Sequence, residues 1–254
     1  MKNPPEHERT VGSVNVIVCA DAESASQKAA ELISNAVRSR PNLVLGLATG
    51  GTPVEMYRQL AKMHEQDGLD FSAAKSFNLD EYIGLGPDHP QSYRMFMQQK
   101  LFDHINIKLE NTFVPDGLAD EPQQHATEFE SLISKAGGIG LQLLGIGQNG
   151  HIAFNEPGST ADSRARVIEL TAATIQSNAR FFDSADEVPK TAITLGIGTI
   201  LEAKRILLLA TGTSKATAIH RALTGKPDIS HPASLLQKHD DVTFIVDESA
   251  ASLL

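Results

Sequence analysis

Short apolar runs alternate with amphipathic segments along most of the chain. The apolar runs predict strands at residues 14–18, 43–48, 75–79, 141–145, 205–210 and 242–246. Their apolar residues are mostly consecutive, which is typical of strands covered on both faces in a parallel sheet. Helical periodicity predicts helices at residues 22–38, 53–63, 92–103, 121–136 and 215–224. This order predicts the α/β class: a single-domain, doubly wound, mostly parallel sheet with helices on both faces, in a modified Rossmann-like arrangement.

The chain is expected to form one domain, because it contains neither an internal repeat nor a low-complexity linker. We place this domain at residues 13–254 and expect the polar, proline-containing residues 1–12 to be a flexible extension. Residues 156–180 have weak periodicity and many small or charged side chains. Two interpretations of this stretch stay open, a mobile lid over a site and an ordinary surface connection.

Four of the predicted strands are followed at once by polar or glycine-rich segments. These segments are residues 49–52, 80–82, 147–156 and 211–215. In an open α/β sheet, ligands bind outside the carboxyl ends of the strands, near a switch in strand order. If the sheet is parallel, the four segments meet at one edge and form a site there.

The loop at residues 145–158 carries the strongest chemical signal. Within eight residues it presents the amide of Asn149, the imidazole of His151 and the carboxylate of Glu156 among several glycines. Histidine suits proton transfer near neutral pH, and Glu156 is placed to orient or tune the ring. A purely structural turn needs neither group, so we interpret this segment as an active-site loop.

Two glycine-rich turns are candidates for binding an anion. In the first, Thr52 is predicted as the N-cap and Pro53 as the first residue of a helix, whose free N–H groups favour a phosphate. It is neither a Walker loop nor a GxGxxG motif, so a tight structural turn stays an open alternative. The second turn adds Lys215, for which a solvated helix position is the ordinary alternative. Arg180 is a second candidate cation, since arginine captures phosphate with two hydrogen bonds.

Asp80 is predicted at the carboxyl end of a strand. A turn or cap residue and a general base are both open interpretations, the second because partial burial raises a carboxyl pKa toward neutrality. Glu81 beside it is expected to play a supporting part. His89 and His231 each precede a proline and are expected in turns. Neither a metal-ligand spacing nor a GxSxG motif is present, so we expect no metal and no cofactor.

Composition and charge narrow the classes of partner. The net charge is −9 and the pI about 5.4, which argues against nucleic acid. No uncharged apolar run is long enough to span a bilayer, and residues 1–10 do not resemble a secretory signal, so we expect no membrane partner. Cys19 is the only cysteine, which suits a reducing compartment, and its apolar run predicts a buried, inert thiol. We expect a cytoplasmic protein.

Four motifs together resemble the glucosamine-6-phosphate deaminases of the glucosamine/galactosamine-6-phosphate isomerase family. They are LATGGTP at 47–53, FNLDEY at 77–82, GHIAFNEP at 150–157 and VPKTAITLG at 188–196. The likeness runs from about residue 14 to the C-terminus, in order, and GHIAFNEP is its most specific part. The resemblance implies an enzyme that converts glucosamine 6-phosphate and water to fructose 6-phosphate and ammonium, in amino-sugar catabolism, without a cofactor.

The resemblance also implies roles for individual residues. Asp80 would be the base that moves a proton from C2 to C1 of the sugar. His151 would open the pyranose ring, with Glu156 holding and tuning it and Asn149 in the same catalytic group. The residues that would hold the sugar phosphate are Gly50, Gly51, Thr52, Arg180 and Lys215.

Three departures from the family pattern affect these expectations. Many members have Asp where this chain has Asn149, which leaves Glu156 as the only charged partner of His151. Members activated by N-acetylglucosamine 6-phosphate have Lys at the position of Ile168, although Ser159 and Arg166 match, and their C-terminal helix extends beyond the position of Leu254. We therefore expect an enzyme without this activation, as a monomer or a small homo-oligomer.

Two alternatives belong to other functional classes. The 6-phosphogluconolactonases share the fold and the first glycine-rich turn, but their pattern around the histidine differs and they lack the segment NLDEY. A non-catalytic sugar-phosphate sensor of the kind found in transcriptional regulators would keep the phosphate turns without needing a base and an acid. Such a sensor would need a helix-turn-helix segment, and none precedes residue 14.

Overall fold

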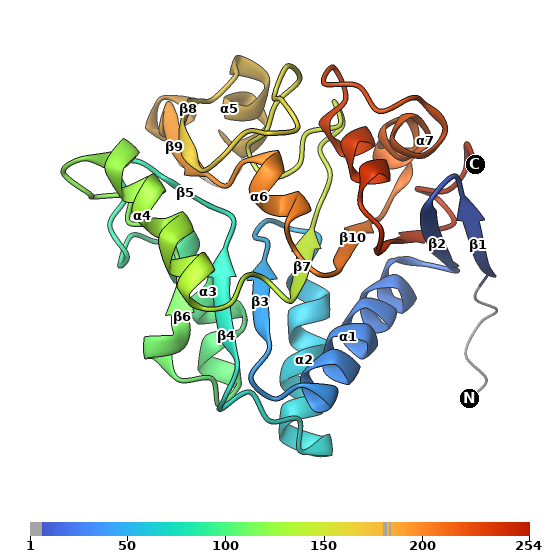
Figure 1. Ribbon diagram of the computed structural model, residues 1–254, viewed down its shortest axis with the longest axis horizontal. Coiled ribbons are helices and arrows are strands. Elements are labelled where there is room, and N and C mark those ends of the chain that lie inside the picture. Colours follow the sequence, from blue (N-terminus) through green and yellow to red (C-terminus); the bar gives the residue numbers. More distant parts are fainter. Residues whose placement is uncertain (1–6, 180–181, 183) are drawn as a thin grey trace.

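The computed structural model describes residues 7–179, 182 and 184–254, in which one large sheet runs through the molecule (Figure 1). In spatial order, its eight strands are β1 (His7–Val11), β2 (Val14–Cys19), β11 (Val242–Asp247), β10 (Ile206–Ala210), β7 (Leu141–Leu144), β3 (Val44–Leu47), β4 (Lys75–Asn78) and β6 (Thr112–Phe113). Every neighbouring pair is parallel except β1 and β2. This confirms the predicted mostly parallel sheet, and all six predicted strands are present.

A second, smaller sheet lies beyond the carboxyl edge of the first (Figure 1). Its three antiparallel strands are β5 (Asp80–Tyr82), β9 (Thr191–Thr194) and β8 (Arg166–Glu169). The chain passes from one sheet to the other at Leu79, whose N–H donates to the Leu47 carbonyl of the large sheet at 3.3 Å. Its carbonyl accepts from Leu195, next to β9, at 2.8 Å. Asp80 therefore lies where the two sheets meet.

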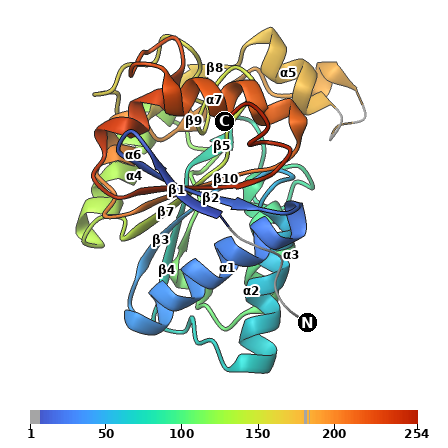
Figure 2. The same cartoon turned by 90° about the vertical axis from the view of Figure 1, so that its right-hand side faces the viewer.

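Helices cover both faces of the large sheet, as predicted. One face carries α1 (Ala22–Ser39), α2 (Val54–Asp67) and α3 (Tyr93–Lys100), and Figure 2 shows α1 and α2 opposite α4 (Pro122–Lys135) and α6 (Ile197–Leu201). The remaining helices are α5 (Ala172–Asn178) and α7 (Ala216–Thr224). Short 3-10 turns occupy η1 (Phe102–His104), η2 (Leu109–Asn111), η4 (Ala185–Glu187), η5 (Thr213–Lys215) and η6 (Pro232–Lys238).

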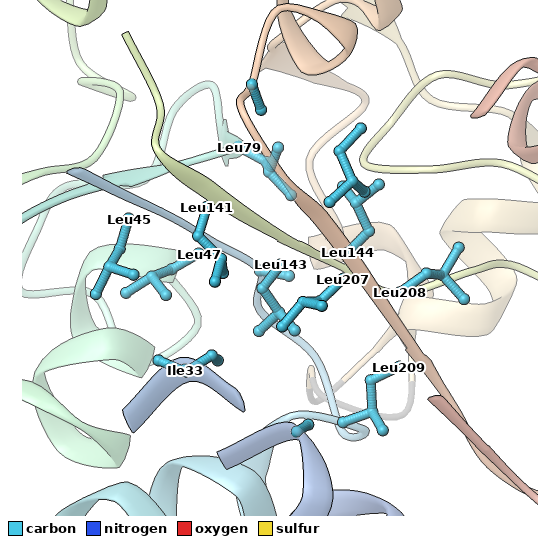
Figure 3. Packing of buried hydrophobic residues seen from close by; sticks show 14 of the residues in the cluster. Ile33, Leu45, Leu47, Leu79, Leu141, Leu143, Leu144, Leu207, Leu208 and Leu209 are labelled. Atoms are coloured by element: carbon cyan, nitrogen blue, oxygen red, sulfur yellow. The ribbon is translucent and has the colours of Figure 1, made fainter. Parts of the chain in front are cut away.

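The central strands form the core because almost none of their residues faces water. All residues of β3, β7, β10 and β11 are buried. Leucines of β3, β7 and β10 and Ile33 of α1 belong to one buried cluster, in which the leucines of neighbouring strands lie side by side (Figure 3). In register, Leu143 is paired with Leu207 and Leu144 with Leu208. Each fully buried leucine side chain contributes about 1.5–3 kcal/mol to folding, so this packing holds the strand ends at fixed positions.

The strand order switches direction between β3 and β7. From β3 the chain adds β4 and β6 on one side, then returns to place β7 on the other side of β3 and continues outward with β10 and β11. At such a point two loops leave neighbouring strands in opposite directions and open a crevice between them. The turn after β3 and the loop after β7 both start at this switch point.

Two local expectations were not met. Thr52 is not the N-cap of α2: the helix begins at Val54, Pro53 is the N-cap, and no side chain caps it. The glycine turn thus continues one residue further, and Tyr57 makes the first helical hydrogen bond, to the Pro53 carbonyl at 2.9 Å. Residues 7–11, assigned to the extension, form β1, a mostly exposed strand whose backbone pairs with β2.

Candidate active site

The four polar segments leave four consecutive strands of the large sheet. These strands are β10, β7, β3 and β4, in that spatial order, and all are parallel. Parallel strands end at the same edge, so the loops that follow them start side by side. The convergence predicted from the sequence is therefore present, and it centres on the switch point.

Asp80 is a buried carboxyl group, 6% exposed, at the start of β5. Its backbone pairs with Thr194 of β9, which fixes the direction of its side chain. Burial raises the pKa of Asp80 to about 8, and the neighbouring Glu81 contributes to this rise. A carboxylate that has been taken out of water and has a pKa near 8 is a much stronger base than a solvated one.

Glu81 plays a larger structural part than the sequence indicates. It is 2% exposed, and its carboxylate accepts the backbone N–H groups of Tyr82 at 2.9 Å, Tyr93 at 2.9 Å and Arg94 at 3.0 Å. The last two lie at the start of α3, so Glu81 joins this helix to the strand that carries Asp80. Burial raises the pKa of Glu81 to about 7, while these three hydrogen bonds oppose the rise.

The ring of His151 lies over a glycine that leaves room for it. A Cβ on Gly147 would be 2.2 Å from Cε1 of His151, which no side chain could tolerate. The loop closes on itself, because the Gly147 N–H donates to the His151 carbonyl at 2.9 Å. Gly150 has φ +85, in the left-handed region that glycine occupies without strain. The glycines of this loop are thus needed both for its turn and for the position of the ring.

Asn149 connects His151 to Glu156. The Asn149 amide donates through Nδ2 to Oε2 of Glu156 at 2.6 Å, so its Oδ1 faces Nδ1 of His151 at 2.7 Å. An amide oxygen only accepts, so Nδ1 carries the proton and Nε2 is left as the atom that can accept one. Glu156 Oε2 lies 3.7 Å from Nδ1. Burial lowers the pKa of His151, Glu156 raises it and Lys215 lowers it, with a net decrease.

The His151 loop contacts the Asp80 strand through β9. The Phe154 N–H donates to Oγ1 of Thr194 at 3.2 Å, and Asn155 donates through Nδ2 to the Leu195 carbonyl at 2.8 Å. Thr194 is the register partner of Asp80. The ring of Phe154 also packs 5.7 Å from that of Tyr82 on β5. Strand β5, which carries Asp80, and the loop that carries His151 are therefore held together through β9.

The candidate phosphate residues surround the same strand ends. Gly50 has φ +97, and neither it nor Gly51 has a heavy atom within 4 Å of the place where a Cβ would stand, so this turn is open to an approaching ligand. Lys215 reaches across from η5 and donates to the Ile146 carbonyl at 2.7 Å, which places it against the His151 loop. Arg180 lies outside the described residues.

Glu156 also lines a cavity of about 510 Å³. The cavity is lined by Phe154, Glu156, Pro157, Gly158, Ser159, Thr160, Ser163, Arg166, Ile168, Glu169 and Thr171. Arg166 donates to the Ser159 hydroxyl at 3.2 Å, and Ile168 stands between the two charged residues of β8. The three positions that the resemblance links to an activator therefore share this cavity.

Several supporting residues were missed or underestimated by sequence reasoning. His89 and His231 both lie in turns, as expected, but His231 is also 3% exposed and lies against Gly150, where a Cβ would be 2.2 Å from its ring. Asp247 accepts the Gly212 N–H at 2.9 and 3.0 Å and so anchors the second glycine turn. A polar residue that directly follows a buried strand was the available signal for Asp247; His231 carried none. Cys19 is buried, as expected.

Within residues 7–179, 182 and 184–254, no three His, Cys, Asp or Glu side chains are grouped as a metal site requires. In the same part of the chain, no helix combines the length and the apolar character needed to cross a membrane.

Fold and site together define an open α/β protein with a buried carboxyl group of raised pKa, an imidazole–carboxylate pair and two glycine-rich turns at one sheet edge. The chain matches the family model for glucosamine-6-phosphate isomerases/6-phosphogluconolactonase over residues 20–245. It belongs to this family.

Similar proteins within the family point to one of its branches. The glucosamine-6-phosphate deaminase of Rhodopirellula baltica is 53% identical over 247 residues, covering 96% of this chain and 98% of the relative. That of Thermoanaerobacter sp. (strain X514) is 50% identical over 241 residues and 95% of each chain. A solved structure described as a monomeric glucosamine-6-phosphate deaminase is 47% identical, with a TM-score of 0.93 over 94% of this chain and 99% of that chain. The 6-phosphogluconolactonase of Trypanosoma brucei, at 20% identity and TM-score 0.77 over 98% of this chain and all of that one, shares the fold alone.

Proposed function

We infer that this chain is a glucosamine-6-phosphate deaminase, which converts glucosamine 6-phosphate and water to fructose 6-phosphate and ammonium. The observation that carries this inference is the junction of Asp80 and the His151 loop through β9, because it holds one buried carboxyl base and one imidazole in a fixed arrangement. About 50% identity to deaminases over 95% of the chain supports it.

The first step of the proposed mechanism opens the sugar ring. Nε2 of His151 takes the proton of the anomeric hydroxyl and passes it to the ring oxygen O5 as the C1–O5 bond breaks, which gives the acyclic aldehyde. The positive charge that develops on the imidazole is stabilised by Glu156, 3.7 Å from Nδ1, through a ring held by Asn149. His151 starts neutral because burial lowers its pKa, so it can accept this proton.

The second step moves a proton from C2 to C1. As a carboxylate, Asp80 removes the C2 proton while the substrate's own ammonium group gives a proton to O1, which forms the enolamine. Asp80 then returns its proton to C1, which yields the iminium ion of fructose 6-phosphate. Water then adds to C2 and ammonium leaves. Since the raised pKa of Asp80 is about 8, the same group is both a strong enough base and a strong enough acid for the two transfers.

The phosphate of the substrate is held, in this proposal, by Gly50, Gly51, Thr52, Arg180 and Lys215. The open turn after β3 supports this placement, since its backbone can approach a ligand closely. Lys215 would supply a positive charge from the end of β10, on the other side of β7. Residues 156–180, which include α5, would form the lid.

We further propose that the enzyme acts as a monomer in the cytoplasm and is not activated by N-acetylglucosamine 6-phosphate. The 47% identical solved relative described as monomeric supports the first point, and the buried single cysteine suits a reducing compartment. The expected lack of activation is supported by Ile168, which stands where the activated members have lysine. A substrate curve that changes from sigmoidal to hyperbolic on adding N-acetylglucosamine 6-phosphate would contradict it.

The function is tested by assaying ammonium release from glucosamine 6-phosphate and, separately, hydrolysis of 6-phosphogluconolactone. We expect turnover of the first compound and none of the second above the spontaneous rate. Asp80→Asn, purified in the same way, controls for contaminating deaminase. Lactone hydrolysis without ammonium release would favour the other branch of the family, and binding of the sugar phosphate without turnover would favour a sensor.

A further inference from the structure

The carboxylate of Glu156 is bound on two sides by different elements. One oxygen, Oε2, faces Asn149 and His151 within its own loop. The other, Oε1, accepts hydrogen bonds from the hydroxyls of Thr174 and Thr171, the latter at 3.3 Å. Thr171 is the N-cap of α5, and Thr174 lies in its first turn. Glu156 thus bridges the imidazole and this helix.

Thr174 is the more specific of the two threonines. Its side chain is 6% exposed, and its hydroxyl has a single proton, which it donates to Glu156. The Thr171 hydroxyl accepts the backbone N–H of Thr174 at 3.2 Å, and its single proton is shared between the Thr174 oxygen at 3.1 Å and Glu156 at 3.3 Å. Thr171 is also exposed, whereas the Thr174–Glu156 hydrogen bond is part-buried.

The other end of α5 is attached to the strand that carries Asp80. Asn178 donates through Nδ2 to the Tyr82 hydroxyl at 2.8 Å, and Ile175 packs against the cluster formed by Tyr82, Phe154, Leu170 and Ala192. The helix therefore contacts the His151 loop at its first turn and β5 at its last. When α5 is docked on the site, the hydroxyls of Thr171 and Thr174 are in contact with Glu156.

We propose that Thr174 is a positioning residue that fixes the Glu156 carboxylate beside His151 when α5 is docked on the site. The inference rests on the proposed function and adds the element that controls the ring-opening pair. A carboxylate held by Thr174 on one oxygen and by Asn149 on the other cannot rotate away from Nδ1 as the imidazole becomes charged. Without the Thr174 hydroxyl, Oε1 keeps only the long contact to Thr171, and the charge is less well placed during ring opening.

The test compares Thr174→Val, which keeps the shape and loses the donor, with Thr174→Ser, which keeps the donor. Thr127→Val is the matched control: this exposed threonine of α4 donates to the Gln123 carbonyl and lies away from the site. We expect Thr174→Val to lower kcat by about 10-fold to 100-fold, the size of a lost hydrogen bond to a charged group. Thr174→Ser should recover most of this loss, and Thr127→Val should match the wild type.

A second measurement separates ring opening from substrate binding. An acyclic 2-amino-2-deoxyhexitol 6-phosphate resembles the substrate after its ring has opened, so Thr174→Val should bind it within about twofold of wild type if only the opening step is impaired. The pH profile of kcat should also change, because His151, Glu156 and Lys215 interact in this region, with Arg166 and Glu169 across the cavity.

Three results would overturn the inference: unchanged kcat in Thr174→Val, equal losses in the valine and serine variants, or loss of acyclic-analogue binding in parallel with kcat. The last two would indicate a merely structural role. If the wild-type protein itself releases no ammonium, the proposed function fails instead, and the two failures are distinguishable.

Discussion

The carboxyl groups of Asp80 and Glu156 belong to one site but are controlled in opposite ways. Among the residues that the structure describes, none donates a hydrogen bond to the Asp80 side chain, and its pKa is raised by burial and by Glu81. Glu156 accepts from Asn149, Thr171 and Thr174. Burial without donors raises the pKa of Asp80, whereas the donors around Glu156 fix where its carboxylate lies. The two carboxyl groups therefore differ in what surrounds them, which suits the different roles proposed for them.

The largest expected effect comes from Asp80→Asn. Without a base for the C2 proton, kcat should fall by about 10² to 10⁴-fold, as measured by ammonium release. At pH 8 the same variant should be more stable than the wild type. The pKa of Asp80 is near 8 in the folded state and about 3.8 in the unfolded state, so between these pH values the folded wild type binds more protons than the unfolded chain. The stability of the wild type therefore decreases as the pH rises. Thermal melts should show a larger gain for Asp80→Asn at pH 8 than at pH 5. Equal gains at both pH values would contradict the raised pKa.

His151→Gln tests the other half of the site. Glutamine can occupy the space but cannot exchange a proton, so kcat should fall by about 10² to 10³-fold. The residual kcat/KM should still rise with pH through about 8, because Asp80 is intact, and this midpoint should be absent from Asp80→Asn. A residual profile without that midpoint would mean that the two groups do not titrate separately.

Glu81→Gln asks how far the surroundings of Asp80 set its pKa. The variant removes a buried negative charge, so the rise in kcat/KM with pH should move to lower pH. The glutamine side chain also has an NH₂ group, which would face one of the backbone N–H groups that now donate to Glu81. Two donors cannot bond to each other, so the start of α3 is held less firmly and kcat/KM should fall by about 10-fold. An unmoved midpoint would assign the raised pKa of Asp80 to burial alone.

The smallest effect is expected from Asn149→Asp. A carboxylate there would face Glu156, which the amide now contacts at 2.6 Å, and would raise the pKa of His151. We expect a change of only about 2–5-fold in kcat/KM near pH 8, since the new carboxylate itself accepts from Nδ1 of His151 and so compensates for the weaker hold on Glu156. Below pH 7 the decrease should become steeper than that of wild type, because Asp80 and His151 would both be protonated there. A pH profile of kcat/KM parallel to that of the wild type would contradict the expected rise in the pKa of His151.

The sequence was sufficient for six of the eight strands of the large sheet, all except β1 and β6, and for most of the residues at its edge. Consecutive apolar residues predicted the buried parallel strands, and polar residues directly after them predicted the edge that carries Asp80 and His151. It was not sufficient for β5, β8 and β9, because these short strands lack a run of consecutive apolar residues and depend on pairing across the chain. The partners of Glu156 also escaped prediction, since Thr174 lies 18 residues away and a threonine in a stretch of weak periodicity gives no sign of its partner. The roles assigned to the site residues stay predictions until the variants are measured.

The position of β11 has a consequence for the order in which the molecule can be assembled. This strand, which ends at Asp247, is inserted between β2 and β10, so the antiparallel pair of β1 and β2 cannot join the rest of the large sheet until residues 242–247 have been synthesised. The first strands to leave the ribosome must therefore wait for the last one, and such distant pairings fold slowly. We expect nascent chains that stop before β11 to be aggregation-prone and inactive, even though Asp80, His151 and Lys215 are already present in them.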